Sequence, residues 1–116
     1  SGGLIDLPLW ADPDDRPRQK VDWQKGKPSQ TYFQVISQST DHPSSNSRIE
    51  FFPITGRTHQ LRVHAADPEG LGVPIRGDRI YSSNPQSHFL HLHARELRFT
   101  HPHTGEDIHL FAKTPF

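Results

Sequence analysis

The strongest constraint on the fold of this chain is a predicted strand that leads through a glycine directly into a predicted helix. Residues 48–54 are rich in branched and aromatic side chains, as is typical of a strand. Gly56 interrupts this run, and residues 58–66 then follow a helical pattern. The helix is expected to end before Pro68, because proline disfavours helix in the residue before it. We therefore expect one short helix directly after a strand.

The helical repeat places an arginine on the apolar side of this helix. At about 100° per residue, the apolar arc consists of Leu61, Ala65 and Ala66. Arg62 falls inside that arc, whereas we expect Gln60 and His64 to point away from it. Arginine keeps its proton, so a buried Arg62 needs an anionic partner. Either its head reaches water or a structural acid such as Asp78, or it pairs with a catalytic acid or a substrate. The pattern does not decide between these alternatives.

Composition limits how much the chain can bury. Only 31% of the 116 residues are hydrophobic and 11 are proline, so little core-forming material is present. The net charge is zero and strand-like runs are clear, which argues against disorder. We therefore expect residues 1–116 to form a single ordered but incomplete domain. The chain contains no methionine, so we expect it to be a segment of a longer protein.

Composition also excludes several classes of function. The chain has no cysteine, which removes disulfides and thiol chemistry and fits a reducing cytoplasm, where we expect the protein to reside. It has no apolar run long enough to span a membrane. Thirteen basic residues balance thirteen acidic ones, so RNA binding would depend on the local placement of charge.

The first part of the chain is rich in proline and charge. We expect residues 4–30 to form an extended surface segment with turns at the prolines. Arg16, Arg18 and Lys20 alternate within it, so an extended backbone would place all three on one side. This segment is either a solvated loop whose acids offset its bases or an arm that contacts phosphates.

The remaining pattern indicates an antiparallel sheet. Four runs look like strands: 31–36, 48–54, 90–99 with a bend near Arg95, and 108–112. Residues 37–47 are expected to form a hairpin loop, and residues 101–105 a turn. Glycines within residues 70–77 suggest a close approach of backbone segments. We therefore expect an α+β fold, mostly antiparallel sheet with one short helix. An open sheet edge could pair with a second copy of the chain.

The sequence gives little evidence for a metal site or for a hydrolase active site. His91 and His93 project from one face of a predicted strand, as a metal-binding pair would. No cysteine is present and no acid stands at a recurrent spacing from them, so we expect no metal site and interpret them as polar members of a half-exposed sheet face. No serine stands in a strand–turn–helix elbow, and no phosphate-cradling glycine motif precedes a helix.

Several separated blocks of the chain resemble the RluA family of RNA pseudouridine synthases. The motif that carries most of this resemblance is Gly56-Arg57-Thr58-His59-Gln60-Leu61-Arg62-Val63-His64. Residues 73–81 and 92–106 resemble the segments that follow it in the family. Residues 4–9, 16–21 and 26–31 resemble members that modify both ribosomal and transfer RNA. The resemblance covers nearly the whole chain in the right order and implies a partial pseudouridine synthase catalytic fold.

The resemblance implies that the chain is the C-terminal part of the catalytic domain. The catalytic aspartate of the family stands in a His-Arg-Leu-Asp motif in the preceding part, and no such tetrapeptide occurs here. Arg62 matches the active-site arginine that pairs with that aspartate. We therefore expect Arg62 to lack its anion within this chain. The parent protein is expected to isomerise uridine without a cofactor, and this chain alone is expected to be inactive.

The resemblance also implies partners. We expect ribosomal or transfer RNA and the missing N-terminal half of the same protein to bind this chain. The candidate RNA-contacting residues are Arg57, His59, Lys27, Arg16, Arg18 and Lys20. Two alternatives stay open: a non-catalytic RNA-binding module on the same scaffold, and a purely structural domain in which Arg62 pairs with Asp78.

Overall fold

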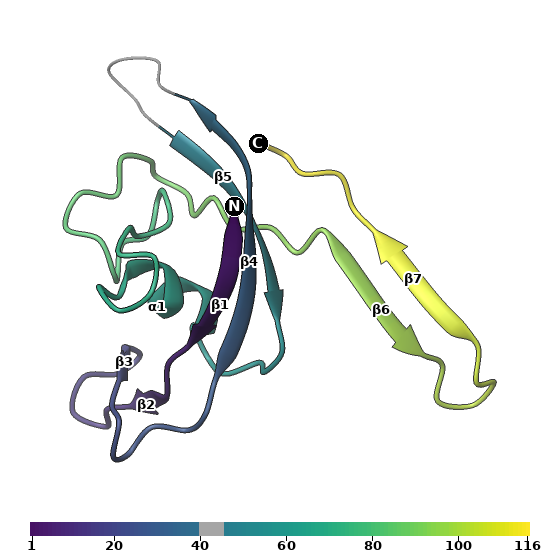
Figure 1. The fold of residues 1–116 in the computed structure, drawn as a ribbon, viewed down its shortest axis with the longest axis horizontal. Helices are drawn as coiled ribbons and strands as arrows, with labels where there is room; N and C mark the ends of the chain where they lie inside the picture. Colours follow the sequence, from purple (N-terminus) through teal and green to yellow (C-terminus); the bar gives the residue numbers. More distant parts are fainter. Residues whose placement is uncertain (40–45) are drawn as a thin grey trace.

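The computed structural model of the chain describes residues 1–39 and 46–116. Within these residues the elements are, in chain order, β1 (Gly2–Asp6), β2 (Leu9–Ala11), β3 (Gln19–Val21), β4 (Gln30–Ser39), β5 (Asn46–Pro53), α1 (Gln60–Ala66), β6 (Glu96–Thr100) and β7 (Asp107–Phe111) (Figure 1). All strand pairings among them are antiparallel. The expected α+β fold, mostly antiparallel sheet with one short helix, is confirmed. No helix in the described ranges is long and apolar enough to cross a membrane.

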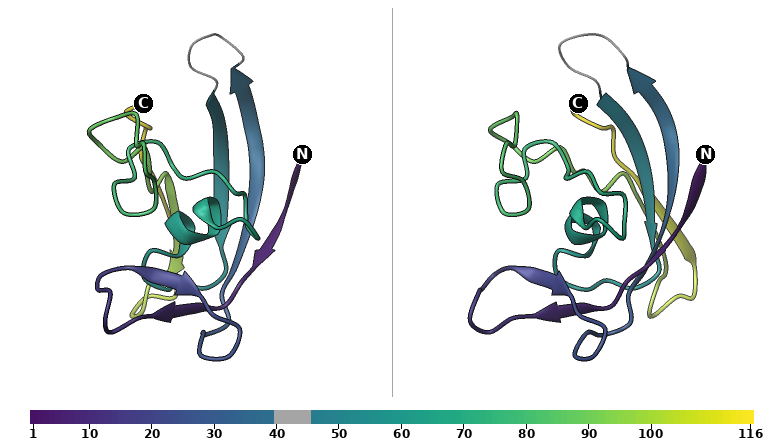
Figure 2. Two further views of the ribbon diagram at one scale, coloured as in Figure 1. Left: turned by 90° about the vertical axis from the view of Figure 1, so that its left-hand side faces the viewer. Right: turned by 60° about the vertical axis from the view of Figure 1, so that its left-hand side comes forward.

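The main sheet has the strand order β1-β4-β5. The helix α1 lies against one face of this sheet, and the small β2–β3 ribbon closes one end of the molecule (Figure 2). The β6–β7 hairpin projects away from both (Figure 1). Within the described part of the chain, β1 and β5 each have a strand partner on one side only.

The small core lies where the first strands meet the helix. Its buried apolar side chains, taken over the described residues, are Ile5, Leu7, Leu9, Val63 and Ala65. The backbone N–H of Leu7 donates to the Ser29 carbonyl at 3.1 Å, which attaches the segment between β1 and β2 to the residue before β4. The prediction that residues 4–30 form an extended surface segment is therefore wrong for its first part. Alternating apolar residues point inward there, whereas the prolines and acids gather in the turn that follows β2.

The helix buries a different face from the predicted one. Gln60 and His64 are 3% and 0% exposed, whereas Leu61, Arg62 and Ala66 are only partly buried. The prediction that Gln60 and His64 point away from the core is therefore wrong. Buried polar side chains are tolerated where every donor and acceptor is satisfied, and both side chains meet that condition here.

A continuous chain of hydrogen bonds satisfies these buried groups. His64 Nε2 donates to the Leu7 carbonyl at 3.0 Å. Because burial lowers the pKa of His64 and favours the neutral imidazole, its Nδ1 accepts from the Thr31 hydroxyl at 2.8 Å. The Thr31 hydroxyl oxygen in turn accepts from Gln60 Nε2 at 2.9 Å. Gln60 Oε1 accepts from the Thr55 hydroxyl at 2.7 Å. These hydrogen bonds join β4, the helix and the segment after β1, while burial of the His64 imidazole lowers its pKa and favours the neutral form.

The C-terminal third differs from the predicted strand pattern. Residues 90–95 form no strand, because this segment crosses the loop after the helix: the N–H of His91 donates to the Arg76 carbonyl at 2.9 Å. Gly77, at φ 85°, permits this crossing, since a Cβ there would lie 1.7 Å from the Phe89 carbonyl oxygen. The close approach predicted for the glycine-rich loop is therefore confirmed.

One predicted turn is confirmed, whereas the predicted ends of two strands are wrong. The turn at residues 101–105 is confirmed by the N–H of Gly105, which donates to the His101 carbonyl at 3.0 Å. Both β4 and β5 extend further than predicted, to Ser39 and from Asn46. The predicted loop over residues 37–47 is therefore wrong at both ends, and its middle, residues 40–45, lies outside the described residues.

The sheet face opposite α1 carries one row of exposed apolar side chains. Leu4, Tyr32 and Phe52 lie directly opposite one another on β1, β4 and β5. They alternate with Ile5 and Thr31, which are buried toward the helix. Each of the three is about half exposed. We call these three side chains the open apolar row.

Candidate functional site

Arg62 forms a two-point ion pair with Asp78. Its Nε donates to Asp78 Oδ2 at 3.0 Å, and its Nη2 donates to Asp78 Oδ1 at 2.6 Å. The side chain of Asp78 is fully buried, and that of Arg62 is 17% exposed. The prediction that Arg62 lacks its anion within this chain is therefore wrong. The acid comes from the loop that follows the helix. It is Asp78, the structural acid that one of the two alternatives in the sequence analysis named as a partner of Arg62.

The loop around Asp78 is built to keep this carboxylate ionised. Burial raises the pKa of Asp78, but the hydrogen bond from Arg62 and those from the N–H groups of Tyr81 and Ile80 outweigh burial and lower it overall. Those two N–H groups donate to Oδ1 at 3.1 and 3.0 Å. The hydrogen bond to Asp78 also raises the pKa of Arg62. Both partners are therefore charged.

A histidine and a tyrosine lie on the other side of the guanidinium. The Arg62 guanidinium lies 5.4 Å from the centroid of the Tyr81 ring. Its Nη1 lies 3.5 Å from His59 Nε2, and His59 Nδ1 lies 2.8 Å from the Tyr81 hydroxyl oxygen. A guanidinium only donates, so Nε2 accepts and the proton of neutral His59 sits on Nδ1. Burial, followed by the charge of Arg62, lowers the pKa of His59 and favours this neutral form.

The N-terminal segment covers the same tyrosine. The Arg18 guanidinium lies 5.3 Å from the Tyr81 ring centroid, and Arg18 also donates to the Ile80 carbonyl. The N–H of Gln19 donates to the Tyr81 hydroxyl oxygen at 2.9 Å. A shallow pocket of about 190 Å³ adjoins this contact and is lined by Arg18, Gln19, Lys20, Val63, Ala66, Asp67 and Tyr81. Tyr81 thus lies between two arginines, and residue types alone gave no signal for it.

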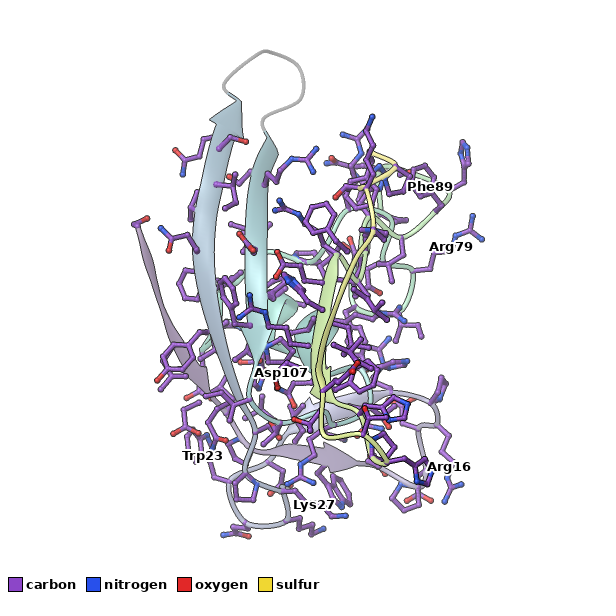
Figure 3. All side chains as sticks on the ribbon, turned by 90° about the vertical axis from the view of Figure 1, so that its right-hand side faces the viewer. Arg16, Trp23, Lys27, Arg79, Phe89 and Asp107 are labelled. Carbon is purple, nitrogen blue, oxygen red and sulfur yellow. The ribbon has the colours of Figure 1, made fainter. Side chains whose placement is uncertain are left out.

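The three alternating cations of this segment do not form one row. Lys20 pairs with Asp12 at 2.6 Å, and Arg18 packs on Tyr81. Arg16 is exposed on the loop between β2 and β3, and Figure 3 shows it apart from Lys27. The structure therefore brings Arg18 and His59 to Arg62, but not Arg16 or Lys20.

The two remaining candidates lie in a second site. Lys27 and Arg57 line a groove of about 440 Å³ at the β2 end of the molecule. Trp10 and Lys25 line it as well, and sequence reasoning missed both. Both residues reach the groove because the β2 segment pairs with the turn before β4, where Leu9 and Lys27 exchange backbone hydrogen bonds at 3.0 and 2.8 Å. Residue types alone do not reveal this pairing.

His91 and His93 were interpreted as polar members of a sheet face, and this interpretation is wrong because residues 90–95 form no strand. Both side chains contact backbone carbonyl groups. His91 Nδ1 lies 3.2 Å from the Phe89 carbonyl oxygen, and His93 Nε2 lies 3.2 Å from that of Ala112. No cluster of three or more histidine, cysteine or acidic side chains suited to a metal ion occurs in residues 1–39 and 46–116.

Comparisons with known proteins show which family the chain matches. Residues 1–67 match the family described as RNA pseudouridylate synthase. The dual-specificity RNA pseudouridine synthase RluA of Yersinia pestis is 44% identical over 117 residues, which cover 98% of this chain and 54% of that protein. The protein of the same name from Haemophilus influenzae is 42% identical over 118 residues, covering 98% of this chain and 51% of that protein.

A solved structure gives the same indication for the fold. Human RNA pseudouridylate synthase domain containing 1 superposes with a TM-score of 0.82 at 28% identity, covering 100% of this chain and 49% of that one. The chain thus spans about half the length of the curated relatives and of the solved structure that it matches.

Proposed function

Because this chain belongs to the RNA pseudouridylate synthase family, we propose that its parent protein isomerises uridine to pseudouridine in ribosomal RNA, transfer RNA or both. The names of the relatives support RNA as the substrate class, and their dual specificity supports more than one kind of RNA. We also propose a cytoplasmic location, on the absence of cysteine.

The observation that carries the proposal is the orientation of Arg62. Asp78 occupies the edge of the guanidinium formed by Nε and Nη2. Nη1 lies beside His59, at the long distance of 3.5 Å. We propose that a catalytic aspartate from the preceding half of the domain binds at Nη1. A guanidinium has five N–H donors and can serve two carboxylates, so pairing with Asp78 is compatible with this role.

Arg62 would then act on the nucleophile without taking part in proton transfer. A cation beside a carboxylate lowers its pKa by about 1 to 3 units, which keeps the aspartate ionised. The target uridine must leave its stack to reach the site. The aspartate attacks the base or the ribose, and the C–N glycosidic bond breaks. The uracil then rotates, its C5 bonds to the ribose C1′, the aspartate is released, and the C5 hydrogen leaves to solvent as a proton. Asp78 and His59 would hold the guanidinium in place during these steps.

We propose that this chain alone does not catalyse the reaction. It contains no His-Arg-Leu-Asp tetrapeptide, and it matches about half of each relative. The open apolar row offers the preceding half of the domain a surface of Leu4, Tyr32 and Phe52 to cover. In its absence, the free edges of β1 and β5 could pair with a second copy of the chain.

Tritium release from uridine-labelled RNA tests the proposal. The parent protein is expected to release tritium and to leave pseudouridine in the RNA, whereas this chain alone is expected to release none. RNA binding by the parent without tritium release would support a non-catalytic RNA-binding module. Turnover by this chain alone would show that the preceding half is dispensable.

A further inference from the structure

The groove at the β2 end of the molecule is separate from the Arg62 site. It is lined by Leu9, Trp10, Ala11, Gln19, Lys25, Lys27, Gly56, Arg57 and Thr58, and its volume is about 440 Å³. We call it the basic groove. Its walls are the β2 segment, Gln19 of β3, the turn before β4 and the turn that leads into α1. Residues from four separate parts of the chain therefore form one surface.

The lining of the basic groove is positive. It contains three cations, Lys25, Lys27 and Arg57, and no acidic residue. The neighbouring Lys20 is different, because Asp12 neutralises it at 2.6 Å. The whole chain has a net charge of zero, so this excess is a local feature. Such a surface attracts an anion even though the protein as a whole does not.

Hydrogen bonds position the backbone of the two lysines and the guanidinium of Arg57. Lys27 exchanges two backbone hydrogen bonds with Leu9, and the N–H of Lys25 donates to Asp22 Oδ1 at 2.9 Å. The Nε and Nη2 of Arg57 donate to the Pro28 carbonyl at 3.3 and 3.2 Å. The guanidinium of Arg57, fixed in this way, loses less conformational entropy when it binds a ligand.

An aromatic ring lies among these charges. The Lys25 Nζ lies 4.6 Å from the centroid of the Trp10 ring, and Lys20 Nζ, from the opposite strand, lies 5.4 Å from it. Trp10 is half-buried and lines the groove. Cations beside an aromatic surface are typical of sites for nucleic-acid strands, in which phosphates meet the charges and a ribose or base covers the ring.

We infer that the basic groove binds the sugar–phosphate backbone of RNA, with Lys25, Lys27 and Arg57 on phosphates and Trp10 against a sugar or base. The choice of RNA as the polyanion rests on the proposed function. Lys25 and Lys27 stand on the turn before β4, and Arg57 stands on the turn that leads into α1. The cations therefore come from two walls of an open groove, which suits successive phosphates of a strand. The turn that carries Arg57 continues to His59, which contacts Arg62. RNA held in the groove would therefore be anchored on the same turn that supports the catalytic arginine.

Fluorescence anisotropy with a labelled RNA hairpin tests this inference on the present chain. The groove variant is Lys25→Gln with Lys27→Gln. The matched control is Arg98→Gln with Lys113→Gln, which removes the same charge from exposed positions in β6 and after β7. Two lost phosphate contacts should weaken binding about tenfold or more near 0.1 M salt. They should also reduce the slope of log K against log salt by about 1.4 to 1.8. The control variant should keep most of the affinity and most of the slope.

Two outcomes would overturn the inference: no RNA binding by the unsubstituted chain, or equal weakening by the groove and control variants. A second measurement in the parent protein uses tritium release. The groove variant should raise KM there and leave kcat nearly unchanged, because neither lysine contacts the Arg62 cluster. If the parent binds RNA through the groove but releases no tritium, the inference stands and the proposed function fails.

Discussion

Asp78 binds Arg62 along one edge of the guanidinium, at 3.0 Å to Nε and 2.6 Å to Nη2, and this leaves Nη1 directed at His59. The carboxylate is fixed by two backbone N–H groups of its own loop, so the arginine inherits a defined orientation. A structural ion pair and an active-site role are therefore compatible in Arg62, because they use different nitrogen atoms.

Replacement of Asp78 by asparagine should disturb both roles. The change leaves the partly buried Arg62 without a carboxylate, which should cost about 2 to 3 kcal/mol in the free energy of unfolding. This loss of stability is smaller than is usual when one partner of a buried ion pair is removed, because 17% of the Arg62 side chain reaches solvent. Urea unfolding of this chain measures it. In the parent protein, kcat for tritium release should fall by more than KM rises, since the arginine is misoriented.

Asp78→Glu is the matched control for that experiment. It keeps the charge and should restore part of the kcat, whereas a purely structural role would give the same kinetics in both variants once both are folded. Unchanged kcat in the asparagine variant would remove Asp78 from the positioning of Arg62.

Arg62→Ala in the parent protein should abolish isomerisation with little loss of RNA affinity. The expected cause is that the catalytic aspartate loses the cation that keeps it ionised and oriented. Tritium release measures the rate, and anisotropy with labelled RNA measures the affinity. Arg62→Lys should rescue little activity, because an ammonium group cannot bind two carboxylates through separate edges. Near-normal tritium release by the alanine variant would refute the proposed role.

The stability of this chain should depend on pH through His64. Burial lowers the pKa of the His64 imidazole, although the hydrogen bond to the Leu7 carbonyl opposes this shift. The unfolded chain, whose histidine pKa is about 6.5, therefore binds a proton at pH values where the folded chain does not. Stability is fully present above about pH 6.5 and falls below it, by at most about 1.4 kcal/mol per pH unit for one histidine.

Urea unfolding between about pH 8 and pH 5 measures this loss. His64→Gln should unfold more easily at high pH, by about 1 to 3 kcal/mol, because Thr31 or Leu7 loses its partner. The same variant should flatten the pH dependence. His59 adds a loss of the same sign, since its pKa is lowered too. An identical slope in the variant would assign the pH dependence to groups other than His64.

The sequence supported the short helix, its end before Pro68 and the turn at residues 101–105, because proline and glycine act on their own neighbourhood. It failed on the buried face of the helix. A helical wheel treats Gln60 and His64 as polar and therefore exposed, but their partners are Thr31 and the Leu7 carbonyl, which come from distant parts of the chain. No local pattern reveals such partners.

The candidate site shows the same limit. The sequence identified Arg62 because it lies inside the apolar arc of the helix. It also named Asp78 as the structural acid that could pair with it. Tyr81, which lies between Arg18 and Arg62, carried no signal, because it depends on the packing of the N-terminal segment against the loop after the helix. In the basic groove, Lys27 and Arg57 were predicted from the sequence, but Lys25 and Trp10 were missed, because they join the groove through the pairing of Leu9 with Lys27.

The open apolar row should matter to the parent protein more than to this chain. Phe52 is already 49% exposed, so Phe52→Ser should change the stability of the isolated chain by only about 1 kcal/mol. If the preceding half of the domain covers the row, the same change should prevent the two halves from associating. Mixing this chain with the separately produced preceding half, and following tritium release, measures that association. Val73→Ser is the control, because Val73 is 67% exposed in the loop after α1. Activity restored equally by both variants would show that the preceding half binds elsewhere, and sedimentation would then show whether a second copy of the chain covers the row.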